Sequence, residues 1–266
     1  MSILETIVTY KQKEVERRKE LISIEKLQFY TYFARDTYSL KQFLLDQDKT
    51  GIIAEFKRKS PSKGIINDSA QIEEVTIGYT NTGASALSVL TDSNFFGGSV
   101  EDLIKVRKIN QIPILRKEFI IDEYQVYEAK ANGADAILLI ASLLEKREAK
   151  QLAKLAHDMK LQVLMEFHNE NDLDILNQDT DIAGINNRNL KTLEVNLNRS
   201  IDLAIKIPDG FLKISESGIT SPEDVLLLRQ YGYTGFLIGE QFMKSPDPVL
   251  AFANFVDSLK NKGYDR

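Results

Sequence analysis

The chain of 266 residues has no cysteine, no tryptophan and only two histidines. Without cysteine it cannot form a disulfide, a thiolate metal site or a thiol nucleophile. Its apolar runs are as short as the one at 136–141, whereas a membrane-spanning helix needs ~20 apolar residues. The opening residues lack the basic segment and apolar core of a secretory signal. These absences favour a protein of the cytoplasm with no membrane partner.

The chain also lacks an excess of basic charge. A net charge of −5 and a pI of about 5.3 argue against a nucleic-acid partner, because binding phosphate backbones needs a basic surface. No group of histidines or carboxylates has the spacing of a metal site. Of the two lone histidines, we expect His157 to be solvated on a helix and His168 to lie at the rim of a site.

From residue 51 onward, short apolar segments alternate with helical patterns. Eight predicted strands lie at 52–56, 86–90, 113–116, 136–140, 162–166, 182–185, 211–215 and 235–238. Strict alternation of strand and helix builds a parallel sheet, and eight such units in about 250 residues suit a closed (β/α)8 barrel, or TIM barrel. An open, doubly wound sheet is disfavoured because no G-x-G-x-x-G follows the first strand. We therefore predict a single α/β domain over 1–266, with a helical extension at 1–50 before the barrel at 51–266.

Local signals mark the helices of the extension and the barrel. Residues 1–22 repeat apolar positions at helical spacing, with a charged run at 11–20 that we expect to face solvent. Residues 23–38 are rich in aromatic side chains and are predicted to be irregular. Four residues have the features of helix N-caps: Ser39, Ser99, Asp122 and Ser221.

Charged side chains recur where the predicted strands end. In the first strand Glu55 and Lys57 share a face, since side chains alternate along a strand. Lys117 and Glu166 take the corresponding place at the ends of the third and fifth strands. The last three strands lead into Asn186 with Arg188, Glu216, and Glu240. Because barrel enzymes place their active sites at the carboxyl ends of the strands, this recurrence predicts a site rather than scattered surface charge.

Glycines in the last two loops predict a place for an anion. Ser217 and Gly218 follow the seventh strand, and Gly239 and Glu240 follow the eighth. Glycine lets backbone N–H groups approach an anion, and the short helix expected at 241–244 adds its N-terminal partial charge. Barrels commonly bind phosphate in these two loops. With lysines and carboxylates beside it, such a site can move protons around a phosphorylated ligand.

Residues 53–64 (IAEFKRKSPSKG) closely resemble the signature of the indole-3-glycerol phosphate synthase family. The similarity covers nearly the whole chain and continues at strand ends, over 115–119, 164–166, 184–190, 215–219 and 236–239. The resemblance implies a lyase of tryptophan biosynthesis, a branch of aromatic amino acid biosynthesis. Its substrate would be 1-(2-carboxyphenylamino)-1-deoxyribulose 5-phosphate, and its products indole-3-glycerol phosphate, CO2 and water. No redox step occurs, so the resemblance implies no cofactor.

The same resemblance implies roles for the strand-end residues. Lys117 would be the general acid and Glu166 the base or acid of the dehydration. Glu55 and Lys57 would tune or replace Glu166, and Glu216 would position Lys117 or the sugar hydroxyls. Substrate contacts would come from Ser60, Phe119, Asn186, Arg188, Leu190 and Leu237, with Ser60 and Phe119 at the anthranilate end. The phosphate would lie on Ser217, Gly218, Gly239 and the backbone amide of Glu240.

Two points leave alternatives open. Some family members carry serine where this chain has Glu240; because a carboxylate repels phosphate, we expect this side chain to point away. A rival enzyme, phosphoribosylanthranilate isomerase, shares the phosphate loops but uses a cysteine after the first strand, which this chain lacks. A non-catalytic sugar-phosphate-binding barrel is the other alternative.

We expect a monomer, with a weak homodimer as a possibility, that acts on a phosphorylated small molecule.

Overall fold

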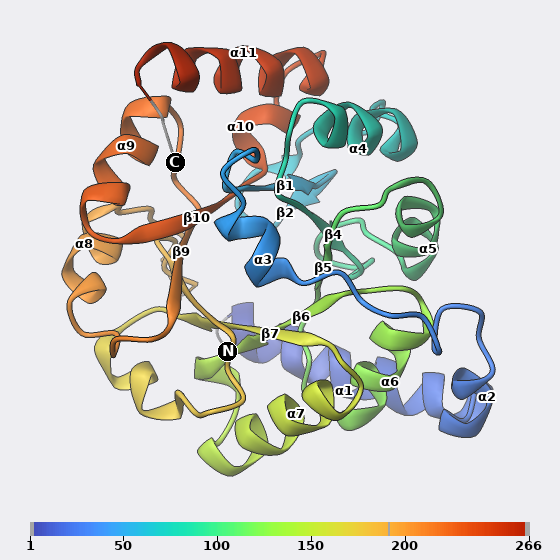
Figure 1. The fold of residues 1–266 in the computed structure, drawn as a ribbon. Coiled ribbons are helices and arrows are strands. Elements are labelled where there is room, and N and C mark those ends of the chain that lie inside the picture. Colours follow the sequence, from blue (N-terminus) through green and yellow to red (C-terminus); the bar gives the residue numbers. More distant parts are fainter. Residues whose placement is uncertain (1–2, 191, 264–266) are drawn as a thin grey trace.

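The computed structural model describes residues 3–190 and 192–263. Its main sheet contains β1 Ile52–Phe56, β4 Ala86–Leu90, β5 Ile114–Lys117, β6 Ala136–Ile140, β7 Gln162–Phe167, β8 Ile182–Asn186, β9 Leu212–Glu216 and β10 Tyr233–Ile238. All neighbouring strands are parallel and β10 pairs back to β1, so the sheet closes on itself (Figure 1). The predicted (β/α)8 barrel is confirmed.

Helices cover the outside of this barrel. They are α4 Ile72–Asn81, α5 Val100–Ile109, α6 Glu123–Ala131, α7 Lys146–Asp158, α8 Asn198–Ala204, α9 Pro222–Gln230, α10 Glu240–Met243 and α11 Pro248–Asn261. Two 3-10 helices, η1 Ala141–Leu143 and η2 Glu170–Ile175, flank α7 and β7. The predicted caps are confirmed at Ser99, Asp122 and Ser221, whose side chains each accept a backbone N–H from the first turn.

Alternation along the strands separates two apolar cores. Ala54 and Phe56 of β1 face the layer between the strands and the helices. Ile53 faces the barrel interior, where it joins Leu115 and Leu164. The short helix α3 Leu40–Leu45 closes one end of this interior with Leu40 and Leu44, and its predicted cap, Ser39, accepts the N–H of Gln42. Period 2 therefore decides which strand residues can reach a site inside the barrel.

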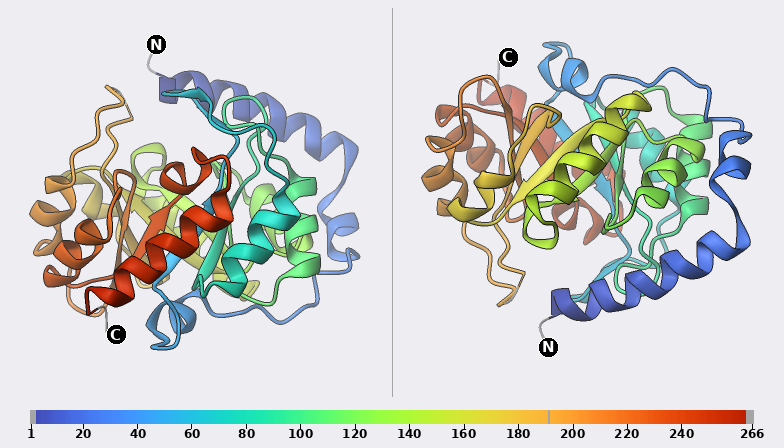
Figure 2. Two further views of the ribbon diagram at one scale, coloured as in Figure 1. Left: turned by 90° about the horizontal axis from the view of Figure 1, so that it is seen from above. Right: turned by 90° about the horizontal axis from the view of Figure 1, so that it is seen from below.

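The helix α1 Ile3–Leu21 lies across the opposite end, beside the hairpin of β2 Lys59–Ser60 and β3 Gly64–Ile65 (Figure 2). The expectation that the charged run at 11–20 is solvated is wrong for Lys11. Its side chain is 1% exposed, and its Nζ lies 3.1 Å from Asp92 and 3.0 Å from Glu118. A buried ammonium needs such partners. Lys11 therefore fastens α1 to the loops that follow β4 and β5.

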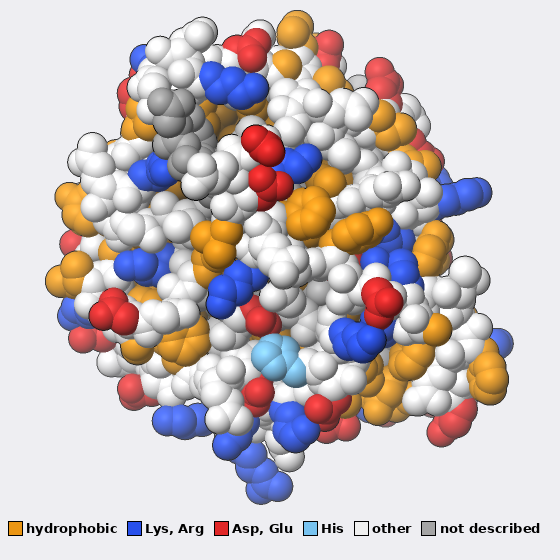
Figure 3. Space-filling view, in the orientation of Figure 1, with side chains coloured by type: hydrophobic (Ala, Val, Ile, Leu, Met, Phe, Trp, Pro, Cys, Tyr) orange, Lys and Arg blue, Asp and Glu red, His pale blue; other side chains and the backbone are white. Residues whose placement is uncertain are grey.

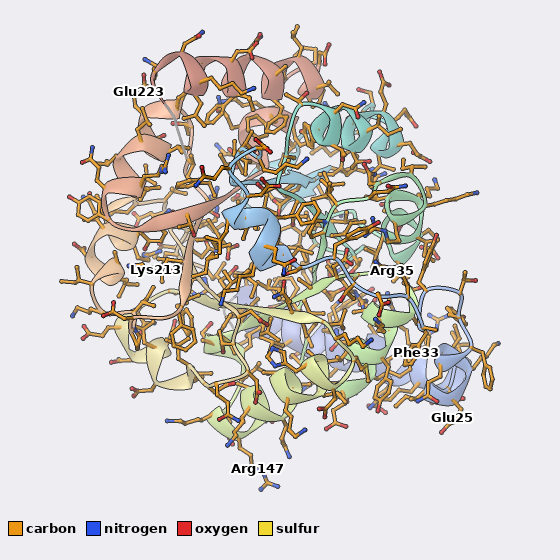
Figure 4. The ribbon with its side chains drawn as sticks, in the orientation of Figure 1. Glu25, Phe33, Arg35, Arg147, Lys213 and Glu223 are labelled. Atoms are coloured by element: carbon orange, nitrogen blue, oxygen red, sulfur yellow. The ribbon has the colours of Figure 1, made fainter. Side chains whose placement is uncertain are left out.

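The segment predicted to be irregular contains a further helix, α2 Ile24–Gln28, which begins at the capping side chain of Ser23. Only five residues long, it has too few apolar repeats for its period to show in the sequence. Beyond it, Phe33 stacks on Tyr127 of α6. Arg35, labelled in Figure 4, donates to Asp135 at the start of β6 over 2.6 Å. Contacts between the extension and the barrel thus continue beyond α1.

None of the described helices is long and apolar enough to cross a bilayer. On the face drawn in Figure 3, lysine and arginine side chains are interspersed with aspartate and glutamate. That face carries no broad patch of a single charge.

Candidate active site

Four ionisable side chains form one layer at the carboxyl end of the barrel. Glu55 comes from β1, Lys117 from β5, Glu166 from β7 and Glu216 from β9. These are alternate strands around the barrel, the arrangement by which a layer of four side chains fills this fold. Two residues earlier on the same four strands lie Ile53, Leu115, Leu164 and Ile214, which form an apolar layer, so charge here takes a place where a packed barrel would have hydrophobic groups. All three carboxylates are at most 3% exposed.

Lys117 stands at the centre of this layer. Its Nζ lies 3.0 Å from Oε2 of Glu166 and 2.5 Å from Oε2 of Glu216. A second lysine, Lys57, donates to Oε1 of Glu55 over 2.8 Å. The other oxygen of Glu55 accepts from Ser88 of β4 over 3.2 Å. Each ammonium is thus held by a carboxylate, which compensates for the loss of water around it.

Burial alone would lower the pKa of Lys117, but the carboxylates of Glu216, Glu166 and Glu55 outweigh it and raise the pKa well above its usual value. Lys117 is therefore charged at neutral pH. Burial by itself would raise the pKa of Glu55, but the ammonium groups of Lys57 and Lys117 lower it overall. Glu55 is therefore ionised.

The two carboxylates on Lys117 differ from each other. Burial, helped by repulsion from Glu166 and Glu55, raises the pKa of Glu216 to about 7 against the attraction of Lys117. Burial by itself would raise the pKa of Glu166, but the attraction of Lys117, with His168 and Asn186 beside the carboxylate, lowers it overall. Two like charges around one cation titrate as a pair. The layer therefore contains a carboxylate that stays ionised, Glu166, beside one that titrates near neutrality, Glu216.

An apolar pocket opens above this layer. The described part of the chain lines it with all the predicted catalytic and substrate-binding residues: Glu55, Lys57, Ser60, Lys117, Phe119, Glu166, Asn186, Arg188, Leu190, Glu216 and Leu237. Phe119 packs against Phe96, with ring centroids 5.9 Å apart. Helix α1 adds Ile3, Leu4 and Ile7 to the wall. An aromatic ring needs such a wall, with a few polar groups to orient it.

A second pocket adjoins the first and is more polar. Gly218, Gly239 and Lys244 line it together with Ser217 and Arg188. The backbone at Ser217 has φ 66, and at Gly218 φ 75. A non-glycine residue in this region stores strain, which is common at ligand sites. The four residues predicted to bind the phosphate, Ser217, Gly218, Gly239 and Glu240, thus line one pocket, which shares lining residues with the apolar one.

Glu240 does not behave as expected from the sequence. Its side chain lines both pockets, and its Oε2 lies 3.2 Å from the guanidinium of Arg188. The ammonium of Lys63 is 4.0 Å from its other oxygen. The prediction that Glu240 points away is wrong because two cations, one from the β2–β3 hairpin and one following β8, attract the carboxylate toward the cradle.

Of the two histidines, one differs from expectation. His157 lies on α7, as predicted, and its side chain is about one-third exposed, with Nε2 paired with Asp181 over 2.8 Å. His168 is not a rim residue: its side chain is 11% exposed, and Nε2 lies 3.2 Å from Oε1 of Glu166. The alternation of side chains along a strand correctly placed His168 on the same side as Glu166. Its burial depends on how the turn after β7 packs, which the sequence does not show.

Several contributing residues were missed from the sequence. Ser88 supports Glu55, and Phe96 completes the aromatic wall. Asn187 is fully buried, and its amide donates to the carbonyl of Ser217 over 3.0 Å. The position of Asn187 inside the 184–190 motif was an available signal. Ser88 carried none, since a serine in a strand has no distinctive pattern.

Fold and site together define a (β/α)8-barrel enzyme with a buried lysine between carboxylates and a neighbouring anion pocket. Residues 4–255 match the family model "Indole-3-glycerol phosphate synthase". Two relatives carry the same name: one from Bacteroides thetaiotaomicron, 47% identical over 97% of this chain and 99% of its own, and one from Bordetella pertussis, 41% identical over 96% and 98%. This chain belongs to the indole-3-glycerol phosphate synthase family.

Similarity to solved structures supports the fold. A chain of the tryptophan synthase α2β2 complex from Pyrococcus furiosus aligns with a TM-score of 0.60 over 80% of this chain and 99% of its own, at 15% identity. At that identity the likeness concerns the barrel alone.

Proposed function

We infer that this chain is an indole-3-glycerol phosphate synthase, which closes the indole ring of 1-(2-carboxyphenylamino)-1-deoxyribulose 5-phosphate and releases CO2 and water. The single observation that carries this proposal is the ammonium of Lys117, held at 3.0 Å from Glu166 and 2.5 Å from Glu216 beneath an apolar pocket. A pre-placed cation stabilises the alkoxide that ring closure creates more than it stabilises the carbonyl.

The two adjoining pockets match the two ends of this substrate. The anthranilate ring would lie in the apolar pocket against Phe119, with Ser60 from the hairpin at its edge. The phosphate would lie in the second pocket on Ser217, Gly218, Gly239 and the amide of Glu240. Binding at both ends bends the substrate between its ring and its phosphate, so the ring carbon and the ribulose carbonyl meet above Lys117.

Ring closure begins when the aniline nitrogen pushes electron density to the ring carbon that bears the carboxylate. That carbon attacks the carbonyl carbon, and the carbonyl oxygen takes a proton from Lys117 to become a hydroxyl group. Loss of CO2 returns the bonding pair to the ring and restores its aromaticity. Asn186 and Arg188 would hold substrate oxygens, and Leu190 and Leu237 would line the space around the ring.

Dehydration completes the indole. The hydroxyl group gains one proton, which solvent supplies, and leaves as water, while the neighbouring carbon gives one proton to Glu166. Glu166, held ionised by Lys117, suits the removal of that proton. Glu55 and Lys57 would tune this step, and Glu216 would hold Lys117 in position. None of these steps needs a redox cofactor.

Other expectations remain part of the proposal. They are a single domain with its extension at 1–50, a monomeric state, a cytoplasmic location, and no nucleic-acid partner. The match of nearly the whole chain to the synthase family disfavours the isomerase alternative.

The test is to add the anthranilate–deoxyribulose phosphate and record indole fluorescence. Synthase activity gives a signal that rises in proportion to enzyme concentration. Absence of signal at high enzyme concentration, with the substrate bound by calorimetry, would favour the non-catalytic barrel instead.

A further inference from the structure

His168 lies behind Glu166, away from both pockets. Its Nε2 is 3.2 Å from Oε1 of Glu166, and its Nδ1 is 3.9 Å from Oδ2 of Asp172. Both ring nitrogens are buried, and among the described residues neither makes a hydrogen bond. His168 is not among the residues that line the apolar pocket or the anion pocket. Any role in the reaction must therefore act through Glu166.

The local structure fixes the histidine in this place. Asn169 caps η2, and Asp172 in the first turn of η2 accepts the backbone N–H of His168 over 2.8 Å. Phe167 faces the outer apolar core, so the next residue returns to the barrel side. The capping box thus holds the backbone while the ring is directed at the carboxylate.

Glu166 needs a partner for each of its oxygens because it is 2% exposed. Lys117 occupies Oε2 at 3.0 Å. The amide of Asn186 also stabilises the ionised form, and Asn186 is itself fixed because its Oδ1 accepts the N–H of Arg188 over 3.0 Å. The Nε2 of His168 lies 3.2 Å from Oε1. A buried carboxylate held at both oxygens cannot rotate freely.

We propose that His168 is a positioning residue for Glu166: its Nε2 faces Oε1 across 3.2 Å and donates to it once Lys117 has given up its proton. The proposal rests on the proposed role of Glu166 in proton transfer. When Lys117 gives its proton to the substrate, Glu166 loses its cationic neighbour at Oε2. The donor at Oε1 then keeps the carboxylate ionised and aimed at the carbon from which it takes a proton. Such support is how a buried catalytic group keeps a productive geometry.

Three substitutions test the proposal. His168→Leu removes the donor and fills most of the space. His168→Gln places an amide N–H near the position of Nε2, and His168→Asn is one carbon too short to reach it. We expect kcat to fall about 10- to 100-fold in the Leu and Asn variants, as misplaced catalytic groups cost up to ~10²-fold, with KM within about twofold. His168→Gln should recover most of kcat.

Equal losses in the Gln and Asn variants would overturn the proposal, as would a raised KM with kcat unchanged. Thermal unfolding of each variant shows whether a loss of kcat comes from failure to fold. If only the Gln variant folds, it still tests the proposal, because its kcat must stay near the parental value. In a Glu166→Gln background, His168→Leu should cause little further loss. If Glu166→Gln itself kept full turnover, the proposed role of Glu166 would fail, whereas loss in Glu166→Gln with none in His168→Leu would overturn only the role of His168.

Discussion

Replacing Lys117 with alanine removes the cation that faces both Glu166 and Glu216. The proposed chemistry then loses its general acid. Proton transfer by a positioned side chain contributes ~10²–10⁴-fold, so we expect kcat to fall by at least this factor, equivalent to about 3–5 kcal/mol in the barrier. KM should change much less, because the apolar wall and the anion pocket remain in place.

The same substitution should alter stability in a pH-dependent way. Removing one partner of a buried ion pair costs ~3–5 kcal/mol, and here two carboxylates lose their partner. Without Lys117 their folded-state pKa values rise, because burial is no longer opposed. A carboxyl whose folded pKa lies above its unfolded value stabilises the fold when protonated, and this contribution is lost as pH rises. The loss of stability in Lys117→Ala should therefore be largest at alkaline pH and become smaller toward about pH 5.

Indole fluorescence gives kcat and KM, and thermal unfolding between about pH 5 and pH 8 gives the stability profile. Lys213→Met is a matched control: this β9 lysine donates to the carbonyl of Ala204 over 3.1 Å and lines neither pocket. It should keep parental kcat. Parental kcat in Lys117→Ala, or an unfolding deficit of equal size at both ends of the pH range, would refute the reasoning.

Three further substitutions test neighbouring groups. Glu166→Gln should cut kcat far more than it changes KM, measured by indole fluorescence; a raised KM with intact kcat would show a binding role instead. Glu216 has its pKa raised from 4.5 to about 7, so its stabilising contribution is present below pH 4.5 and lost as pH rises through about 7. Glu216→Gln should therefore flatten the pH dependence of the unfolding temperature in this window, and parallel curves would contradict the assignment. Glu240→Gln removes the carboxylate 3.2 Å from Arg188, so inorganic phosphate should inhibit about two- to fivefold more strongly, the range of a partly exposed ion pair; unchanged inhibition would show that Glu240 does not compete for the anion pocket.

The barrel could be predicted from the sequence because each strand carries a short apolar segment and each helix a local start signal. The four predicted caps depend on a side chain and an N–H two or three residues away, so the sequence contains all the information they need. The short helix α2 was missed because five residues are too few to display a period.

Which strand-end residues share one end of the barrel could be predicted for a related reason. Period 2 tells which residues of a strand face the interior, and the parallel barrel brings all the strand ends to one edge. Glu55, Lys117, Glu166 and Glu216 therefore had to meet, although they are far apart in the chain. Their chemical roles came from the resemblance to a family, not from the pattern.

Only the tertiary structure decided which of these carboxylates faces Lys117 and how the pKa of each is shifted. The sequence shows three equivalent glutamates, but which of them faces Lys117, and at which oxygen, depends on strand register and on burial. Lys11 is buried against Glu118 although its helix has a charged sequence, and the Nε2 of His168 lies 3.2 Å from Glu166. Electrostatic and packing energies depend on distance in space and on exclusion of water. The sequence therefore determined which residues reach the end of the barrel, and the fold determined what each of them faces there.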